Sequence, residues 1–161
     1  NLDRKLISLK KEIDFISNYL EIMKLRFPDK LDIQLSVDKT LEQLQIPPML
    51  LQPLVENSIK YGFVNRSQKF HLVLSAQVEE DSAVLFVEDS GRGFPDAFRG
   101  TFDQNHAFTV PDNPESDNHV GIRNIYQRLL MYYGENASLK IDWTGEWSRV
   151  EITIQDWEKY R

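Results

Sequence analysis

The sequence of 161 residues contains no cysteine, which excludes disulfides, thiol nucleophiles and cysteine-ligated metal clusters. Its apolar runs reach only five residues, as in Ala83 to Val87, whereas a membrane-spanning helix needs roughly 20. Basic residues are in the minority, 19 against 25 acidic ones, so a broad surface for nucleic-acid phosphates is not expected. With 41% hydrophobic and 27% charged residues, we expect a soluble globular unit of about one domain.

Two nucleotide motifs and one metal pattern are also missing. No GxxxxGK[ST] sequence occurs, and Gly91-Arg92-Gly93 is followed by Asp96 where GxGxxG requires its third glycine. The histidines His71, His106 and His119 lack the spacing of paired metal ligands, so each is expected to be solvated. Walker-type, Rossmann-type and histidine-ligated metal sites therefore lose support.

The first part of the chain has an apolar residue at every fourth and third position in turn. This spacing predicts a helix over the first 27 residues, about 40 Å long, with a heptad seam. We expect the seam to mediate dimerisation, and the alternative is docking of the helix on its own domain. The seam residues are Leu2, Leu6, Leu9, Ile13, Ile16, Leu20, Met23 and Phe27, and Ile7, Phe15, Tyr19 and Ile22 widen it.

Phe27-Pro28-Asp29 ends this helix, because proline lacks the amide donor and disfavours helical geometry in the preceding residue. Beyond it, hydrophobic patterning predicts about five strands. Their approximate ranges are 31–37, 70–78, 83–87, 139–143 and 150–154, the last two forming a hairpin around Thr144-Gly145-Glu146.

Two further helices are predicted, roughly over 48–61 and 121–133. They end at Gly62 and Gly134, where we expect left-handed backbone geometry. The acidic stretch between Gly93 and Gly121 shows no periodicity and is predicted to be a long loop.

The helix that ends at Gly62 carries residue types suited to a nucleotide. Asn57, Lys60 and Tyr61 have i, i+3 and i+4 spacing and share a stripe. A carboxamide oxygen suits Mg²⁺, an ammonium suits phosphate oxygens, and Glu56 can orient water or a nucleophile. The plainer alternative is a surface helix with a weak ion pair between Glu56 and Lys60.

A predicted buried strand ends at Asp89 and is followed by Gly91-Arg92-Gly93. The glycines allow the backbone to approach a ligand closely, and the carboxylate can accept a hydrogen bond from an exocyclic amine such as that of adenine. An ordinary β-turn explains the same residues.

Gly121 and Ile122 begin a predicted helix after the acidic loop, so the first free amides can face a phosphate, with Arg123 and Arg128 nearby. An amphipathic helix with solvated arginines is the alternative.

Together the three clusters resemble the N box and the two glycine boxes of the Bergerat-type ATPase fold, found in histidine kinases, DNA gyrase and MutL, over about residues 30–156. The amino-acid sequence at 47–57, at 121–124 and at Arg128-Leu129 resembles that of the LytS/YesM-type bacterial sensor kinases. Residues 18–27 also resemble the second helix of that family's dimerisation and phosphoacceptor hairpin.

The resemblance implies an α+β fold, a two-layer sandwich whose mixed sheet of about five strands is covered by helices on one face, with ATP and Mg²⁺ as cofactors. By position, Asn57 would ligate Mg²⁺, Asp89 would bind the adenine amine, and Glu56 would polarise the attacking imidazole. The other implied nucleotide contacts are Lys60, Tyr61, Gly91, Gly93, Gly121 and Ile122.

Two features depart from the family pattern. His119-Val120-Gly121 keeps only the later glycine of the second glycine box, and the His-Phe-X-Phe-Asn motif that carries the phosphorylated histidine does not occur. We therefore expect a fragment, with 1–28 the end of the helical hairpin, 29–161 the ATP-binding domain, and the acceptor helix and membrane segments N-terminal to Asn1. A natural nucleotide-binding module is the alternative.

The implied activity is transfer of the ATP γ-phosphate to a histidine outside this chain, and then to a response-regulator aspartate. The implied partners are a second copy, through the N-terminal helix, and a receiver domain. The implied location is the cytoplasmic side of a bacterial plasma-membrane protein. A degenerate module without turnover is the main alternative. An ATP hydrolase of the gyrase or MutL kind is less favoured, because a long segment with a heptad pattern precedes the domain.

Overall fold

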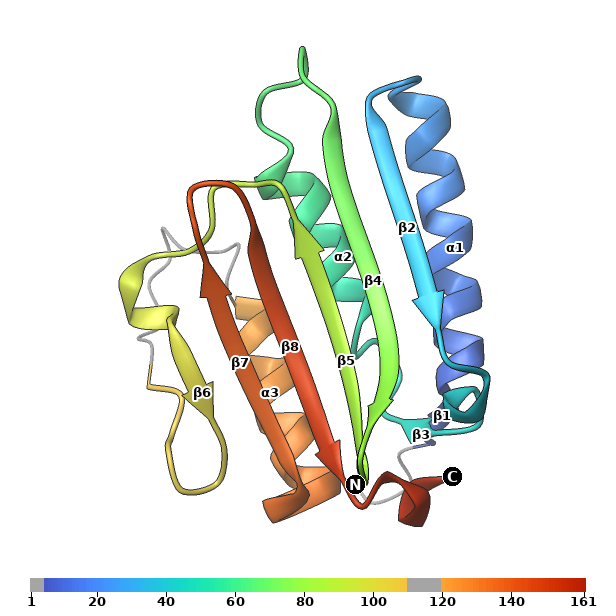
Figure 1. The fold of residues 1–161 in the computed structure, drawn as a ribbon, viewed down its shortest axis with the longest axis vertical. Coiled ribbons are helices and arrows are strands. Elements are labelled where there is room, and N and C mark those ends of the chain that lie inside the picture. Colours follow the sequence, from blue (N-terminus) through green and yellow to red (C-terminus); the bar gives the residue numbers. More distant parts are fainter. Residues whose placement is uncertain (1–4, 110–119) are drawn as a thin grey trace.

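The computed structural model describes residues 5–109 and 120–161, and its main feature is a six-stranded mixed sheet. Strand order is β2-β4-β5-β8-β7-β6; β2 and β4 are parallel and the other neighbours antiparallel (Figure 1). The strands are β2 (Leu31–Val37), β4 (Phe70–Glu79), β5 (Ser82–Asp89), β6 (Gly100–Phe102), β7 (Ala137–Trp143) and β8 (Ser148–Gln155).

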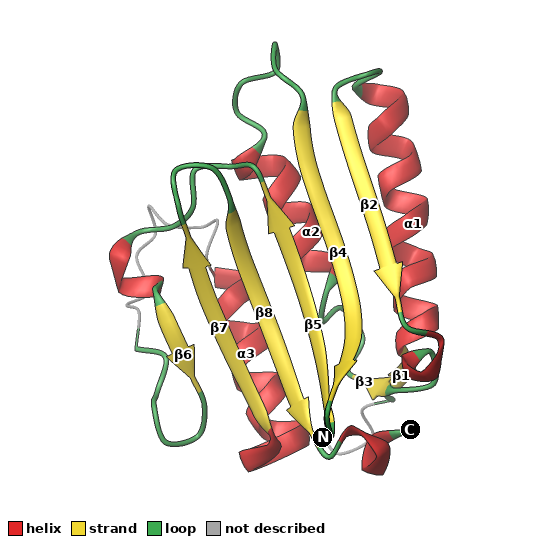
Figure 2. Ribbon diagram, viewed as in Figure 1, coloured by secondary structure: helices red, strands yellow, loops and turns green. Residues whose placement is uncertain are grey.

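Three helices cover one face of this sheet, as Figure 2 shows. They are α1 (Leu9–Arg26), α2 (Gln52–Asn57), which continues as a π-helical turn over Ser58–Gly62, and α3 (Val120–Tyr133). Side chains from the helices and from the covered face of the sheet form one hydrophobic core. The predicted two-layer α+β architecture is confirmed.

The first helix is shorter than the heptad pattern predicts. It begins at Leu9, because the hydroxyl of Ser8 caps the helix by accepting a hydrogen bond from the amide of Lys11 at 3.1 Å. Ile7–Ser8 forms β1, which pairs with β3 (Gln45–Ile46). Leu6 therefore precedes the helix, and Leu2 lies outside the described residues.

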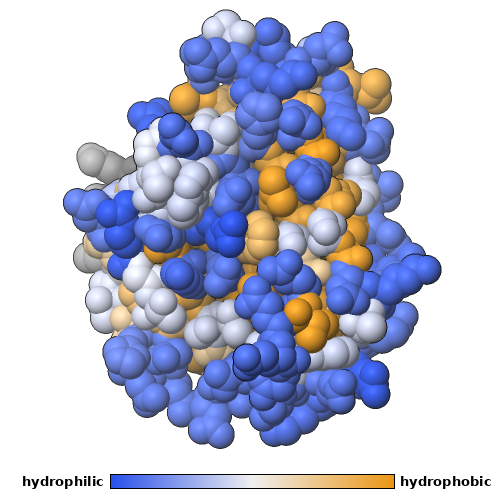
Figure 3. All heavy atoms as spheres, in the orientation of Figure 1, coloured by the Kyte–Doolittle hydropathy of each residue, from blue (hydrophilic) through white to orange (hydrophobic). Residues whose placement is uncertain are grey.

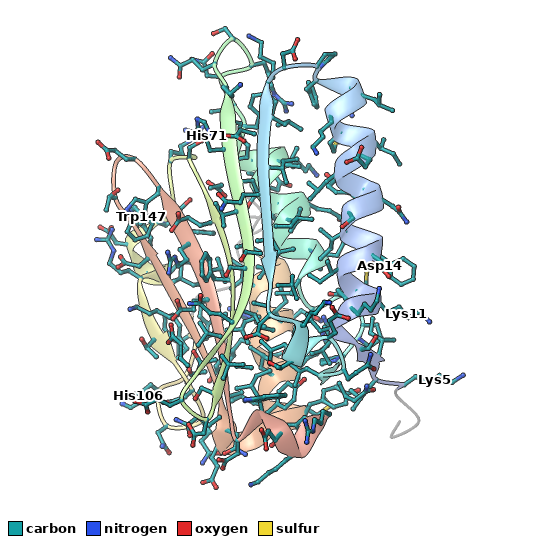
Figure 4. All side chains as sticks on the ribbon, turned by 45° about the vertical axis from the view of Figure 1, so that its right-hand side comes forward. Lys5, Lys11, Asp14, His71, His106 and Trp147 are labelled. Carbon is teal, nitrogen blue, oxygen red and sulfur yellow. The ribbon has the colours of Figure 1, made fainter. Side chains whose placement is uncertain are left out.

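One side of α1 packs on its own domain. Leu9, Ile16 and Leu20 are buried in the common core, whereas Ile22 and Leu25 are 60% and 82% exposed. The alternative of intramolecular docking therefore describes the inner side of this helix. Its outer side, where Figure 4 shows Lys11 and Asp14 pointing away from the domain, leaves room for a partner.

The region predicted as a loop between Gly93 and Gly121 is not wholly irregular. A 3₁₀ turn at Asp96–Phe98 precedes β6, which pairs with β7 and makes the sheet six strands rather than about five. Three-residue β6 is too short to show a period of two, which is why patterning missed it. Residues 110–119 of this region lie outside the described part.

The helix predicted over 48–61 begins later than expected, at Gln52. Met49 has a left-handed φ of 61°, which interrupts any helix from Pro48. Gly134 has the expected left-handed φ of 55°, but Gly62 is not among the residues with positive φ, so that expectation was wrong for Gly62.

The other face of the sheet carries no helix in the described residues. Figure 3 shows it as mainly hydrophilic, with hydrophobic spheres gathered over β2 and β4. His71 and His106 lie far apart (Figure 4), with side chains 57% and 74% exposed, as predicted for solvated residues; His119 lies outside the described residues. No helix among the described residues combines the length and apolar character needed to cross a membrane.

The two sides of α1 can be separated by a matched pair of substitutions. Ile16→Ala removes a fully buried side chain and should lower the free energy of unfolding by about 2–5 kcal/mol, because it leaves a cavity. Ile22→Ala, at a 60% exposed position, should change it by less than about 0.5 kcal/mol in the dilute monomer. Urea denaturation measures both, and equal losses would contradict this packing.

Candidate nucleotide-binding site

A cleft of about 500 Å³ lies between the α2 segment, the start of α3 and the adjoining ends of β5 and β8. Its floor is apolar and its rim carries polar and cationic groups, a distribution typical of small-molecule sites. The lining residues are Leu54, Asn57, Ser58, Lys60, Tyr61, Gly62, Val64, Val87, Asp89, Arg92, Gly93, Phe94, Pro95, Ile122, Ser148 and Val150.

Asp89 ends β5 and presents its carboxylate to this cleft. Its Oδ1 accepts hydrogen bonds from the amide of Gly91 at 2.7 Å and from the hydroxyl of Ser148, its cross-strand partner, at 2.9 Å. Burial raises the pKa of Asp89, and these bonds, with one from Ser58, oppose that rise. A carboxylate offers about four acceptor sites, so three donors leave capacity for a ligand amine.

Gly91 donates its amide to the carboxylate of Asp89 and does not itself line the cleft. A Cβ on Gly91 would lie 2.7 Å from Asp89 Oδ1 and 2.8 Å from the Cα of Gly62. The loop after β5 and the end of the α2 segment therefore touch backbone to backbone. At Gly62, whose φ is not left-handed, a Cβ would lie 3.1 Å from Cζ of Phe70 and 3.3 Å from Asp89 Oδ1, so the available space also favours glycine there.

Gly93 lines the cleft and has a φ of 83°. A Cβ there would lie 2.5 Å from Cγ of Trp143, so both the backbone and the packing require glycine. Phe94 continues the contact, with its ring centroid 6.0 Å from that of Trp143. The second glycine of the predicted box therefore packs on the end of β7.

The α2 segment carries the predicted polar stripe into the cleft. Asn57, Lys60 and Tyr61 all line it, and the Lys60 ammonium lies 5.0 Å from the centroid of the Tyr61 ring. The segment changes from α-helix to π-helix at Ser58, and π-turns of this kind are frequent at functional sites. The predicted stripe is therefore present as a single wall.

The start of α3 forms the facing wall. Ile122 is 1% exposed and contributes to the floor with Val87 and Val150. Gly121 does not line the cleft, but a Cβ at this position would lie 3.5 Å from the carboxamide nitrogen of Asn57. The N box and the second glycine box are therefore direct neighbours.

Glu56, like Gly91 and Gly121, is a predicted site residue that lies outside the cleft lining. It accepts a hydrogen bond from the side-chain amide of Gln52 at 3.0 Å and does not line the cleft. Burial raises the pKa of Tyr19 on α1, and the negative charge of Glu56 raises it further. Glu56 therefore lies on the side of α2 that faces α1, and its catalytic role stays a prediction.

Several lining residues were not predicted. Ser148 pairs with Asp89 across two strands that are distant in sequence, and no local pattern indicates this register. Ser58 and Arg92 lie inside the predicted motifs, so their position in the sequence could have identified them as candidate cleft residues. The sequence indicates only that Val87 and Val150 are core residues. Their place in the cleft depends on how the strands pair.

Comparison with known proteins agrees with this geometry. A family model described as Histidine kinase matches residues 1–31. The sensor protein LytS of Oceanobacillus iheyensis is 32% identical over 149 residues, which are 92% of this chain and 25% of that protein. The sensor histidine kinase/phosphatase LytS of Staphylococcus aureus is 30% identical over 141 residues, which are 86% of this chain and 23% of that protein. Over most of its length, the chain is similar to sensor proteins of the LytS type.

The solved structures support the fold of this chain. The catalytic domain of histidine kinase ThkA matches with a TM-score of 0.65 at 13% identity, covering 97% of each chain. ThkA in complex with the response regulator protein TrrA matches with a TM-score of 0.60 at 13% identity, covering 97% of this chain and 42% of that one. The chain spans about a quarter of the length of its curated LytS relatives.

Gly93 and Gly145 provide a matched pair for testing the loop. Gly93→Ala should lower the free energy of unfolding by about 2 kcal/mol or more, because it combines a left-handed φ with a clash against Trp143. Gly145→Ala meets nothing within 4 Å and should cost less than about 0.5 kcal/mol. Thermal unfolding measures both, and a similar loss at the two positions would contradict the packing.

The raised pKa of Asp89 has a consequence for stability. An acid whose pKa is higher in the folded state stabilises the fold while protonated, and this stabilisation is lost as pH rises through the folded-state pKa. The Asp89→Asn variant has no such loss, so its stability relative to the unmutated chain should rise between about pH 4 and pH 7. Unfolding midpoints at the two pH values measure this, and a constant or falling difference would show that burial does not dominate.

Proposed function

We propose that this chain is the ATP-binding catalytic region of a two-component sensor histidine kinase. The observation that carries the proposal is the carboxylate of Asp89, fixed at the mouth of an apolar cleft by Gly91 and Ser148. An acceptor held in that position favours a base with an exocyclic amine, because a base without one would leave the remaining acceptor capacity of the carboxylate unused. Adenine supplies such an amine.

The wall that carries Asn57 and Lys60 receives the triphosphate in this proposal. The Lys60 ammonium offsets phosphate charge, and the carboxamide oxygen of Asn57 is an oxygen ligand of the kind that Mg²⁺ takes. The described residues contain no group of three His, Asp or Glu side chains that could hold a metal. A single protein ligand fits Mg²⁺ that is held mainly by phosphates and water, where it would neutralise charge developing on the transferred group.

In the proposed reaction a histidine nitrogen forms a bond to the γ-phosphorus while the bond from that phosphorus to the ADP oxygen breaks. The chain's part is to position the nucleotide and to balance its charge. We propose Glu56 as the group that polarises the attacking imidazole, since it faces α1, the helix that resembles the family's hairpin. The phosphoryl group then passes to a response-regulator aspartate, and the structure of ThkA with TrrA supports a partner of this class.

We propose that residues 1–28 end the helical hairpin and that 29–161 form the ATP-binding domain. The exposed apolar side chains of α1, Phe15, Ile22 and Leu25, support dimerisation through its outer side. By analogy with its LytS relatives, the intact protein would hold this region on the cytoplasmic side of the plasma membrane.

Calorimetric titration with Mg·ATP tests the proposal. The unmutated chain should bind, and Asp89→Asn should weaken binding at least about tenfold, since it replaces a charged acceptor with a carboxamide. Asn57→Ala should weaken binding in magnesium, and the loss should shrink when magnesium is replaced by EDTA. Failure of the unmutated chain to bind would favour a module without turnover.

A further inference from the structure

The α2 segment, which carries most of the polar cleft residues, begins without a cap of its own. Leu51 occupies the N-cap position with no side-chain hydrogen bond to the helix, and Pro53 has no amide hydrogen to donate. Six α-helical residues are also far too few to be stable alone. The start of this helix must therefore be fixed by another part of the chain.

Glu12, on the inner side of α1, provides the missing acceptors. Its Oε1 accepts a hydrogen bond from the amide of Met49 at 2.8 Å, and its Oε2 accepts from Leu51 at 2.7 Å and from Gln52 at 3.4 Å. Glu12 is 1% exposed, and a buried carboxylate is tolerated only where such donors surround it. It acts as a helix cap supplied from 37 to 40 positions away.

The same segment is held from α3. The guanidinium of Arg128 donates hydrogen bonds to the carbonyl oxygens of Pro48 and Met49. Met49 has a φ of 61°, a conformation that costs energy for a side chain of this size and that persists where the surroundings impose it. The amide of Met49 is bound by α1 and its carbonyl by α3, so the entry to α2 has little freedom.

The other end of the α2 segment also contacts α1. Phe63, directly after the π-helical turn, meets Phe27 edge-on with ring centroids 5.3 Å apart. The Arg66 guanidinium lies 4.5 Å from the Phe27 ring centroid and 4.4 Å from that of Phe63. Contacts at both ends make the α2 segment follow the position of α1.

We propose that Glu12 is a positioning residue for the nucleotide site, through which nucleotide affinity depends on the placement of α1. Asn57 lies five residues after Gln52, so a change at the start of α2 moves Asn57 and Lys60 relative to Asp89. Glu12 itself is not one of the residues that line the cleft. The proposal rests on the proposed function, because its main consequence is a change in Mg·ATP binding.

The test uses the whole chain with Glu12→Gln, which keeps the size of the side chain. The amide of glutamine has only one acceptor oxygen. Its NH₂ group would face backbone N–H groups that now donate hydrogen bonds to the carboxylate. At a temperature well below unfolding, we expect Mg·ATP affinity to fall about tenfold and the amides of Met49 and Leu51 to exchange faster. Arg128→Gln, which loosens the same segment from α3, should weaken binding in the same direction.

Ile154→Ala is the matched control for lost stability. Ile154 is fully buried in β8, six residues beyond Ser148, and does not line the cleft. This variant should unfold more easily yet bind Mg·ATP with unchanged affinity while folded.

The proposal is overturned if Glu12→Gln binds as tightly as the unmutated chain, or if Ile154→Ala weakens binding equally. If the unmutated chain does not bind Mg·ATP, the proposed function fails separately. In that case, amide hydrogen exchange at Met49 and Leu51 tests the role of Glu12 by itself. Unchanged exchange rates in Glu12→Gln would overturn that role.

Discussion

The close approach of two backbones at Gly62 and Gly91 is the constraint on which the site depends. A Cβ on Gly91 would lie 2.8 Å from the Cα of Gly62, so the loop after β5 can approach the α2 segment this closely only with glycine at position 91. Next to this contact, Asp89 accepts a hydrogen bond from Ser58 and lines the same cleft as Asn57. Without it, the carboxylate and the polar stripe would belong to separate surfaces.

Tertiary contacts rather than helix propensity hold the wall of the cleft in place. The α-helical part of α2 is six residues long, and a carboxylate from α1 and a guanidinium from α3 hold the chain at its start. After the π-helical turn, Phe63 meets Phe27 edge-on. Packing provides most helical stability in proteins, and this segment is an extreme case. The arrangement makes the geometry of the proposed binding residues a property of the whole helical layer.

Local patterns predicted much of this structure and failed where distant residues decide. The strands at 31–37 and 70–78 have a clear period of two, and the Asp89-to-Gly93 motif is contiguous, so both could be predicted. The late start of α2 could not, because it depends on Glu12. The inward packing of α1 was predicted only as the alternative, since a heptad seam looks the same whether it meets a second chain or its own sheet.

The parallel pairing of β2 with β4 also explains where the proposed binding residues of α2 lie. Parallel neighbours cannot be joined by a tight turn, so the chain must leave β2, travel over the sheet and return to the same end before β4 begins. The α2 segment is part of that crossover connection. Its path is therefore dictated by sheet topology, and replacing it with a short hairpin would require β4 to reverse direction.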